Sequence, residues 1–305
     1  MADPAAAPNS DSLRSLDFYI VAGPTASGKS DLAVSLAERF GGEIVGADAF
    51  QVYRGLEILT AKPSAEMRQR VPHHLVDEIP LTQSFDVGQY LTLANRRIAE
   101  IRERGRIPFV VGGTGLYLRA LTCGLADLPP ADPQLRETLS AQSVEELQRQ
   151  YAALDPDGYA QIDHQNPRRL VRAIEVCLLT GQPFSRFREQ WSRPIANFRG
   201  ITCVRAREEL YARIDERTEL MFRSGVEEEV RACGPLGPTA SQTLGLSEIQ
   251  SLLRGEMSQS SCIAAIQQAT RRYAKRQMTW LRREVSLTPM DLSLPSNSPL
   301  VEGLA

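Results

Sequence analysis

Short apolar runs alternate with helical patterns in the first third of the chain. Runs at 17–22, 43–47 and 107–111 have the length of buried strands. Apolar residues recur at helical spacing over 28–40 and 87–101, and glycines follow both stretches. This alternation predicts an α/β fold with a doubly wound parallel sheet, whose ligand crevice lies beyond the carboxyl ends of the strands.

The alternation stops between residues 123 and 199. Amphipathic helical patterns in this segment are separated by prolines, which predicts a helical insertion domain. The strand pattern returns at 201–204. The catalytic core is therefore expected to comprise residues 17–122 and 200–284.

The remaining elements and the two ends of the chain follow from the same patterns. Helices are expected at 207–223, 241–254 and 259–283. Residues 1–16 are rich in Ala, Pro, Asp and Ser, so we expect a disordered tail. Residues 285–305 are rich in Ser, Pro and Leu and are expected to form a fraying C-terminal tail.

Composition narrows the class of protein. The 305 residues are 42% hydrophobic and 24% charged, as in globular proteins. The sequence lacks an apolar stretch of about 20 residues and a signal-peptide pattern, so we expect a cytoplasmic protein with no membrane partner. Its five cysteines are widely spaced, which argues against a disulfide framework and against structural zinc. The net charge of −2 means that a nucleic acid would need a local basic patch.

A glycine-rich segment with the pattern GxxxxGK[ST] lies between the first strand and the first helix. In such a loop, backbone N–H groups and the helix N-terminus hold phosphate oxygens. Lys29 would add a positive charge, and the Ser30 hydroxyl could bind Mg²⁺. The alternative is a glycine turn without a ligand. The predicted polyphosphate site comprises Gly23, Pro24, Thr25, Ala26, Ser27, Gly28, Lys29 and Ser30.

Two further features are expected to face the same crevice. Asp48 follows the run 43–47 and could orient Mg²⁺ or accept a proton, or it could cap a following helix. The segment 111–117 (VGGTGLY) allows close approach to a ligand, or it simply forms a tight turn. The amide of Gln51 could read a base edge, although such a residue is more often a surface side chain.

The roles of the histidines and of the arginine clusters have more than one interpretation. His73 and His74 are adjacent but His164 is remote, which favours structural roles over metal binding. Basic clusters at 166–172 and 271–283 could contact nucleic-acid phosphates. Alternatively, they form solvated helix faces, or the second cluster pairs with Glu227–Glu229.

The phosphate loop, Asp48 and an insertion would suit a small-molecule kinase, but the strand at 107–111 does not end in a second acidic metal ligand. Seven motifs instead resemble, from residue 19 to residue 283, those of bacterial tRNA dimethylallyltransferases. They are GPTASGKS, ADAFQVYRG, TAKPS, PHHLVD, GRIPFVVGGTGLYLRAL, NPRRLVRAIEV and TRRYAKRQMTWLRR. The resemblance implies a P-loop kinase-like fold whose loop holds a diphosphate leaving group.

The resemblance also implies the reaction. A dimethylallyl group would pass from dimethylallyl diphosphate to the N6 amine of adenine 37, in the anticodon stem-loop of tRNAs that read codons beginning with U. Asp48 would be the general base, Thr114 would line the reaction channel, and Arg217 would close on the diphosphate. Ser30 would contact Mg²⁺, and the enzyme would act as a monomer.

Residues that would contact tRNA follow by motif. They are Asp48, Ala49, Phe50, Gln51, Thr114, Arg136, Arg168, Arg169, Leu170, Val171, Arg172, Gln242, Thr243, Leu244, Gly245, Leu246 and Ser247. Gly46 and Ala49 stand where the usual motif has serines. Three alternative functions are an adenylate isopentenyltransferase that uses free AMP, a P-loop small-molecule kinase, and a non-catalytic tRNA-binding protein.

Overall fold

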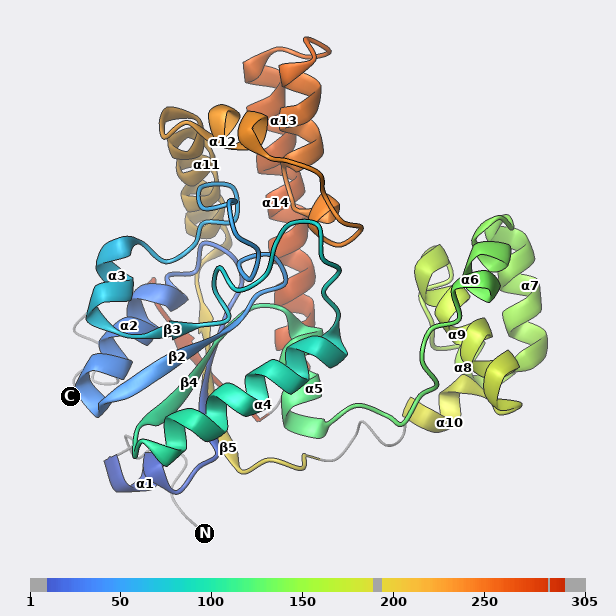
Figure 1. Ribbon diagram of the computed structural model, residues 1–305, viewed down its shortest axis with the longest axis horizontal. Coiled ribbons are helices and arrows are strands. Elements are labelled where there is room, and N and C mark those ends of the chain that lie inside the picture. Colours follow the sequence, from blue (N-terminus) through green and yellow to red (C-terminus); the bar gives the residue numbers. More distant parts are fainter. Residues whose placement is uncertain (1–9, 189–193, 285, 294–305) are drawn as a thin grey trace. The chain divides into compact units, whose positions relative to one another are not determined.

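The computed structural model describes residues 10–188, 194–284 and 286–293 (Figure 1). Residue contacts divide the chain into two compact units. One unit comprises residues 1–121 together with 196–305, and the other comprises residues 122–195. The insertion was expected to span 123–199, but residues 198 and 199 belong to a strand of the sheet.

A six-stranded sheet forms the centre of the first unit. Its strands are β1 (Phe18–Ala22), β2 (Gly42–Ala47), β3 (His73–His74), β4 (Ile107–Gly112), β5 (Phe198–Val204) and β6 (Thr288–Asp291). They lie in the order β3-β2-β4-β1-β5-β6, and every neighbouring pair is parallel. The predicted α/β fold with a P-loop kinase-like parallel sheet is confirmed.

Helices cover both faces of this sheet (Figure 1). The helices of the first unit are α1 (Ser10–Arg14), α2 (Lys29–Phe40), α3 (Ala65–Arg70), α4 (Val87–Glu103), α5 (Gly115–Cys123, whose last two residues begin the second unit), α11 (Arg207–Arg223), α12 (Val226–Ala232), α13 (Leu246–Leu253) and α14 (Gln259–Leu281). Among the described residues, none of these helices is long and apolar enough to cross a membrane.

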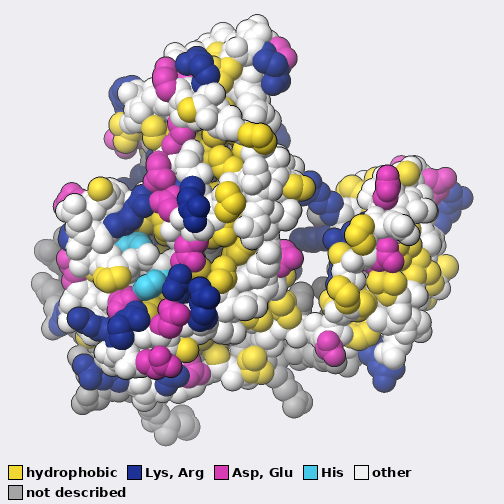
Figure 2. All heavy atoms as spheres, in the orientation of Figure 1, with side chains coloured by type: hydrophobic (Ala, Val, Ile, Leu, Met, Phe, Trp, Pro, Cys, Tyr) yellow, Lys and Arg dark blue, Asp and Glu magenta, His cyan; other side chains and the backbone are white. Residues whose placement is uncertain are grey.

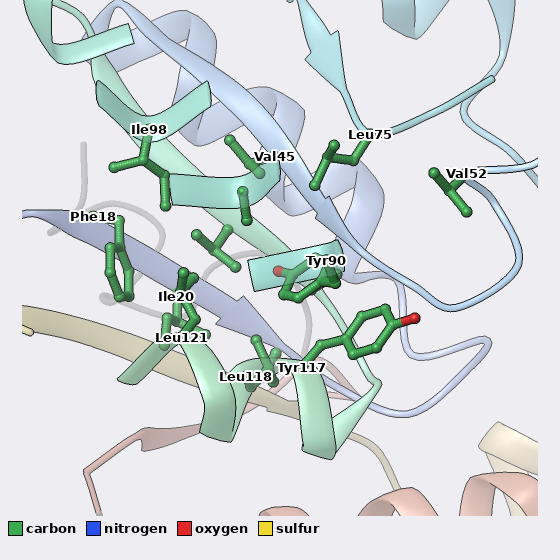
Figure 3. Packing of buried hydrophobic residues seen from close by; sticks show 14 of the residues in the cluster. Phe18, Ile20, Val45, Val52, Leu75, Tyr90, Ile98, Tyr117, Leu118 and Leu121 are labelled. Carbon is green, nitrogen blue, oxygen red and sulfur yellow. The ribbon is translucent and has the colours of Figure 1, made fainter. Parts of the chain in front are cut away.

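Alternation of side chains along each strand builds two apolar layers. On one face, Phe18 and Ile20 of β1 and Val45 of β2 pack against α4 and α5 (Figure 3). There the rings of Tyr90 and Tyr117 stack with their centroids 4.1 Å apart. On the other face, the intervening strand residues pack against α1 and α2. The strands are thus buried on both sides, as in other parallel sheets.

The two predicted tails are wrong in part. Residues 10–14 form α1, and Leu13 and Leu16 are buried against the sheet. Residues 288–291 form β6, which pairs with β5 and buries Met290. Each segment contains a few apolar residues whose burial compensates for ordering a short element, and average composition conceals this. Residues 1–9, 285 and 294–305 of the two predicted tails lie outside the described residues.

The second unit is helical, as expected. Its helices are α6 (Pro133–Ser140), α7 (Val144–Leu154), α8 (Pro156–Tyr159), α9 (Pro167–Thr180) and α10 (Phe184–Arg188). Side chains of Asp132, Ser143 and Asn166 accept N–H groups of the first turns of α6, α7 and α9. A separate small core includes Leu139, Leu147 and Leu170.

Candidate active site

The register of the sheet assembles the candidate site. Ala22 of β1 and Ala47 of β2 both lie opposite Gly112 of β4. The three strands therefore end at one edge, and the residues that follow them are neighbours. This edge brings together the phosphate loop after β1, Asp48 after β2 and the glycine turn after β4.

The phosphate loop has the backbone geometry that its glycines suggest. Gly28 has φ 90°, and Ala26 also lies in the left-handed region with φ 63°. A Cβ atom at Gly23 would lie 2.7 Å from Ser27 Oγ, so a side chain has no room there. The loop then enters α2, whose first N–H groups face the site, as the polyphosphate hypothesis requires.

Lys29 is a poorly solvated cation. Its Nζ atom donates to the Pro24 carbonyl at 3.4 Å, which is a long hydrogen bond. Burial lowers the pKa of Lys29, and the negative charge of Asp48 opposes this effect. Lys29 is half-buried, and its ammonium makes one long hydrogen bond within the described residues, so it is favourably placed to bind an anion.

Three arginines hold three successive residues of the phosphate loop. Arg217 of α11 donates from Nη2 to Thr25 Oγ1 at 2.7 Å. Arg213, one turn earlier, donates from Nε to the Ala26 carbonyl at 2.9 Å, and Arg205 donates from Nε to the next carbonyl, that of Ser27, at 2.8 Å. Arg205 is also paired with Glu209, so Arg213 and Arg217 supply the positive charge at this loop beyond that of Lys29.

Arg217 has a polar atom available within this cluster. Its Nε atom is buried and has no hydrogen-bond partner among the described residues. Burial also lowers the pKa of Arg217, although its guanidinium remains charged at neutral pH. Leaving such a donor unpaired is costly, and an anion bound at the loop would satisfy it. Arg205 and Arg213 were not among the predicted site residues, and for Arg213 the i, i+4 spacing with Arg217 was the available signal.

Asp48 caps a turn rather than a helix. Its Oδ1 atom accepts the N–H groups of Phe50 at 2.9 Å and Gln51 at 3.3 Å. Residues 48–64 are all described, and no helix begins among them, so the helix-cap alternative is wrong. These bonds use only Oδ1 and fix the carboxylate at the strand edge, where Oδ2 can accept a proton.

The glycine turn after β4 lies directly beside Asp48. A Cβ atom at Gly112 would be 2.1 Å from the Ala47 carbonyl oxygen, so glycine is required for this approach. The Thr114 N–H donates to the same carbonyl at 3.3 Å. The buried Thr114 Oγ1 has no hydrogen-bond partner among the described residues. It is a second polar group at this edge that a ligand could satisfy.

One cavity lies between the end of the phosphate loop and Asp48. Its lining includes Lys29, Ser30, Asp48, Gln51 and Gly112. Lys29 and Ser30 of the predicted polyphosphate site therefore share one cavity with Asp48.

Gln51 and Lys62 organise the loop next to this cavity. The Gln51 amide nitrogen donates to the carbonyls of Thr60 at 3.1 Å and Ala61 at 3.0 Å. Lys62, whose side chain is 1% exposed, pairs with Glu57 and Asp77. The Gln51 amide group thus supports the loop, and this structure does not direct its nitrogen toward a base.

The two adjacent histidines have structural partners, as expected. His73 Nδ1 lies 2.7 Å from the Val71 carbonyl, and His74 Nε2 lies 2.7 Å from Glu43 Oε2. In the part of the chain that the structure describes, no three His, Cys, Asp or Glu side chains are grouped as metal ligands.

The arginine cluster of α14 is partly internal. Arg271 pairs with Asp215 and lies over the ring of Tyr211. The predicted pairing of the basic cluster 271–283 with residues 227–229 is wrong. Glu229 instead accepts the N–H groups of Ile58 and Leu59, each at 2.8 Å. Basic and acidic side chains are interspersed over the visible face of the sheet-containing unit, so no single-sign field covers it (Figure 2).

The helical unit uses two of its expected tRNA contacts internally. Glu175 of α9 is fully buried and accepts two hydrogen bonds from Arg136, each at 2.9 Å, and one from Arg172 at 2.6 Å. Leu170 and Val171 are buried in the core of this unit. They were expected to contact tRNA, and this is wrong, because they occupy the inner face of α9. Arg169, with a side chain 62% exposed, remains on the surface.

The segment 242–247 shows the same separation of faces. Thr243, Gly245 and Leu246 are buried, so they are also wrong as direct contacts, whereas Gln242 and Ser247 are exposed. A motif identifies a contacting segment, but helix and turn periodicity decides which of its side chains face outward.

Replacing Glu175 with Gln is expected to destabilise the helical unit by roughly 2–3 kcal/mol, because two arginines lose a buried anionic partner. Burial alone raises the pKa of Glu175, but hydrogen bonds from Arg136 and Arg172 outweigh it and lower the pKa. The stabilisation is therefore present above the ordinary carboxyl pKa of about 4.3 and is lost as the pH falls through the lower folded-state value.

Amide hydrogen exchange of α6 and α9 measures this effect. The loss of stability in the Gln variant should become smaller toward acidic pH. Amide exchange of α4, in the other unit, should be unchanged. Glu137→Gln, at an exposed position of α6, is the matched control. Equal exchange in both variants would contradict the prediction.

Comparisons with known proteins identify the family of this chain. The family model for IPP transferase matches residues 51–284. A tRNA dimethylallyltransferase of Akkermansia muciniphila is 45% identical over 281 residues, which cover 92% of this chain and 94% of that protein. The crystal structure of a tRNA isopentenylpyrophosphate transferase from Bacillus halodurans is 35% identical, with a TM-score of 0.67 and 93% of each chain covered. A eukaryotic dimethylallyltransferase acting on tRNA is 25% identical with a TM-score of 0.75, covering 90% of this chain and 73% of that one.

Proposed function

Because this chain belongs to the IPP transferase family, we propose that it is a tRNA dimethylallyltransferase that modifies the N6 amine of adenine 37. The proposed acceptors are tRNAs that read codons beginning with U, bound through the anticodon stem-loop. The observation that carries the proposal is the shared cavity of Lys29, Ser30 and Asp48 at one strand edge. We expect a monomeric cytoplasmic enzyme.

Each part of the site has a role in the transfer. The amine nitrogen forms a bond to C1 of the dimethylallyl group, and the C1–O bond breaks with its electron pair leaving on the diphosphate. The proton of the amine passes to the Asp48 carboxylate. Lys29 and Arg217 stabilise the negative charge that grows on the leaving group. The target base must leave its stack to reach the carboxylate.

We propose that Mg²⁺ assists at the diphosphate. The Ser30 hydroxyl lines the cavity and offers an oxygen ligand of the kind that Mg²⁺ prefers. Mg²⁺ usually takes few protein ligands and completes its shell with phosphates and water, so this hydroxyl fits and Asp48 stays free to accept the proton. When bound, the ion supplies further neutralisation of the leaving group.

A small-molecule kinase is the alternative enzyme. Its metal would normally rest on an acidic residue after the strand beside the phosphate loop. β4 instead ends at Gly112 and is followed by Gly113 and Thr114, whose buried hydroxyl has no hydrogen-bond partner among the described residues. This turn suits a channel for an acceptor better than a second metal ligand.

The purified protein tests the proposal directly. It is incubated with dimethylallyl diphosphate and unmodified tRNA, and the nucleosides are then analysed by mass spectrometry. We expect N6-isopentenyladenosine at one position and release of one diphosphate per group transferred. Transfer to free AMP but not to tRNA would establish the adenylate isopentenyltransferase, and ATP turnover would establish the kinase.

Arginines on the outer surface of α9 are expected to make salt-sensitive contacts with tRNA. Affinity for an anticodon stem-loop should fall by about 0.7–0.9 log units per phosphate contact for each tenfold increase in salt. Replacing Arg168 and Arg169 with Ala should therefore flatten the slope by up to about 1.5 log units. Fluorescence anisotropy at several salt concentrations measures the slope.

The control for this measurement removes the same charge elsewhere. Arg39 and Arg106 are exposed near the amino-terminal edge of the sheet, away from the candidate site. Their double Ala variant should keep the wild-type slope. If both double variants flatten the slope equally, α9 has no specific part in docking.

A further inference from the structure

One side chain of α14 connects the two loops of the site. Gln277 is 6% exposed. Its Oε1 atom accepts the Thr25 N–H of the phosphate loop at 2.9 Å, and its Nε2 atom donates to the Gly113 carbonyl at 3.0 Å. A single amide thus joins the loop after β1 to the turn after β4.

The surrounding backbone is closely fitted to this amide. A Cβ atom at Gly113 would lie 2.4 Å from Gln277 Nε2 and 2.6 Å from the Gly23 carbonyl oxygen. One turn further along α14, the indole of Trp280 lies against Gly115, where a Cβ atom would be 2.3 Å from the ring. The end of α14 therefore sets how closely the two loops approach.

We propose that Gln277 is a positioning residue that fixes the phosphate loop relative to the turn carrying Thr114. Thr25, which Gln277 holds by its N–H, holds Arg217 by its hydroxyl. The same amide thereby orients a cation of the leaving-group site and a wall of the acceptor channel. The inference rests on the proposed transferase function, because it concerns the alignment of donor and acceptor.

The chemistry of the bridge restricts which side chains can replace the amide. One end must accept from an N–H, and the other must donate to a carbonyl. A neutral carboxylic acid meets both requirements, whereas a carboxylate meets the first and repels the Gly113 carbonyl. Methionine has similar length and meets neither, so it leaves two buried polar groups unpaired.

Three variants separate alignment from packing. Gln277→Glu keeps the shape, Gln277→Met removes both hydrogen bonds, and Gln268→Glu places the same charge at an exposed position of α14. Single-turnover rates and KM for dimethylallyl diphosphate are measured with tRNA from about pH 6 to about pH 8.5, together with thermal stability. The affinity of inorganic diphosphate is measured by calorimetry.

We expect both Gln277 variants to lower the single-turnover rate by roughly 10- to 100-fold at the alkaline end, with a smaller change in KM. The single-turnover rate of Gln277→Glu relative to that of the wild type should rise as the pH falls, because protonation of the new carboxylate restores a donor to the Gly113 carbonyl. Gln277→Met should show no such recovery, and Gln268→Glu should match wild type at every pH. Inorganic diphosphate should bind both Gln277 variants more weakly.

Two outcomes would overturn the inference. One is a wild-type rate in Gln277→Met. The other is equal losses in Gln277→Glu and Gln277→Met at every pH, which would assign Gln277 to packing alone. Failure of the wild-type protein to transfer dimethylallyl to tRNA in the same assay would instead count against the proposed function, so the two failures are distinguishable.

Discussion

Replacing Asp48 with Asn is expected to slow the chemical step by roughly 10²–10⁴-fold while tRNA affinity changes by less than a few-fold. The amine of adenine is a weak nucleophile because its lone pair is delocalised into the ring. Removal of its proton therefore contributes strongly to the rate. The Asn side chain keeps an oxygen for the N–H groups of Phe50 and Gln51, so the turn should survive. Single-turnover kinetics and stem-loop binding measure the two quantities separately.

Asp86 supplies a matched control for this substitution. Its Oδ1 atom also accepts a backbone N–H at 2.9 Å, that of Gln89, at the N-terminus of α4. Asn caps helices about as well as Asp, so Asp86→Asn should leave the rate unchanged. If Asp48→Asn also had an unchanged rate, Asp48 would only stabilise the turn and would have no part in the chemical step.

Replacing Arg217 or Lys29 with Ala is expected to reduce use of dimethylallyl diphosphate by about 10²–10³-fold each. Both side chains are half-buried beside the phosphate loop, where poor solvation strengthens their interaction with an anion. The leaving group gains negative charge in the transition state, so most of the loss should fall on the rate of the chemical step. The rate is measured against donor concentration with tRNA saturating.

Arg223 lies on the same helix as Arg217 and is exposed near its C-terminal end. Arg223→Ala should retain the wild-type rate. A loss shared by both arginine variants would indicate damage to α11 rather than loss of a cation at the site. If the turnover of ATP depended on Lys29 and Arg217, and transfer from dimethylallyl diphosphate did not, the transferase assignment would be wrong.

The strands that position the site were predictable from the sequence. The side chains from distant parts of the chain that contact the phosphate loop were not. Asp48 and Gly112 follow apolar runs, and a parallel sheet brings the ends of such runs to one edge. No local pattern shows that Gln277 reaches Thr25, because 252 positions separate them in the chain. Arg205 was missed for the same reason, since it follows β5 and meets the phosphate loop only in the folded chain.

The errors among the predicted tRNA-contacting residues have a different physical origin. Motif similarity suggested Leu170 and Val171 as contacts because they lie between arginines in the sequence. Helical periodicity places them on the inner face of α9, and Arg169 on the outer face. Arg136 and Arg172 could have been suspected of internal pairing only if Glu175, one turn after Arg172, had been recognised as buried.

The pairing of β1 with β5 has a consequence for the order of folding during synthesis. Phe18 lies beside Phe198, so the central strand cannot acquire this neighbour until nearly two thirds of the chain has been made. The helical unit is contiguous in sequence and needs no partner from outside it to build its own core. Local contacts form faster than distant ones, and domains fold as units as they emerge from the ribosome. The helical unit should therefore fold on the ribosome before the sheet closes around the phosphate loop, and the nascent chain would acquire its active site last.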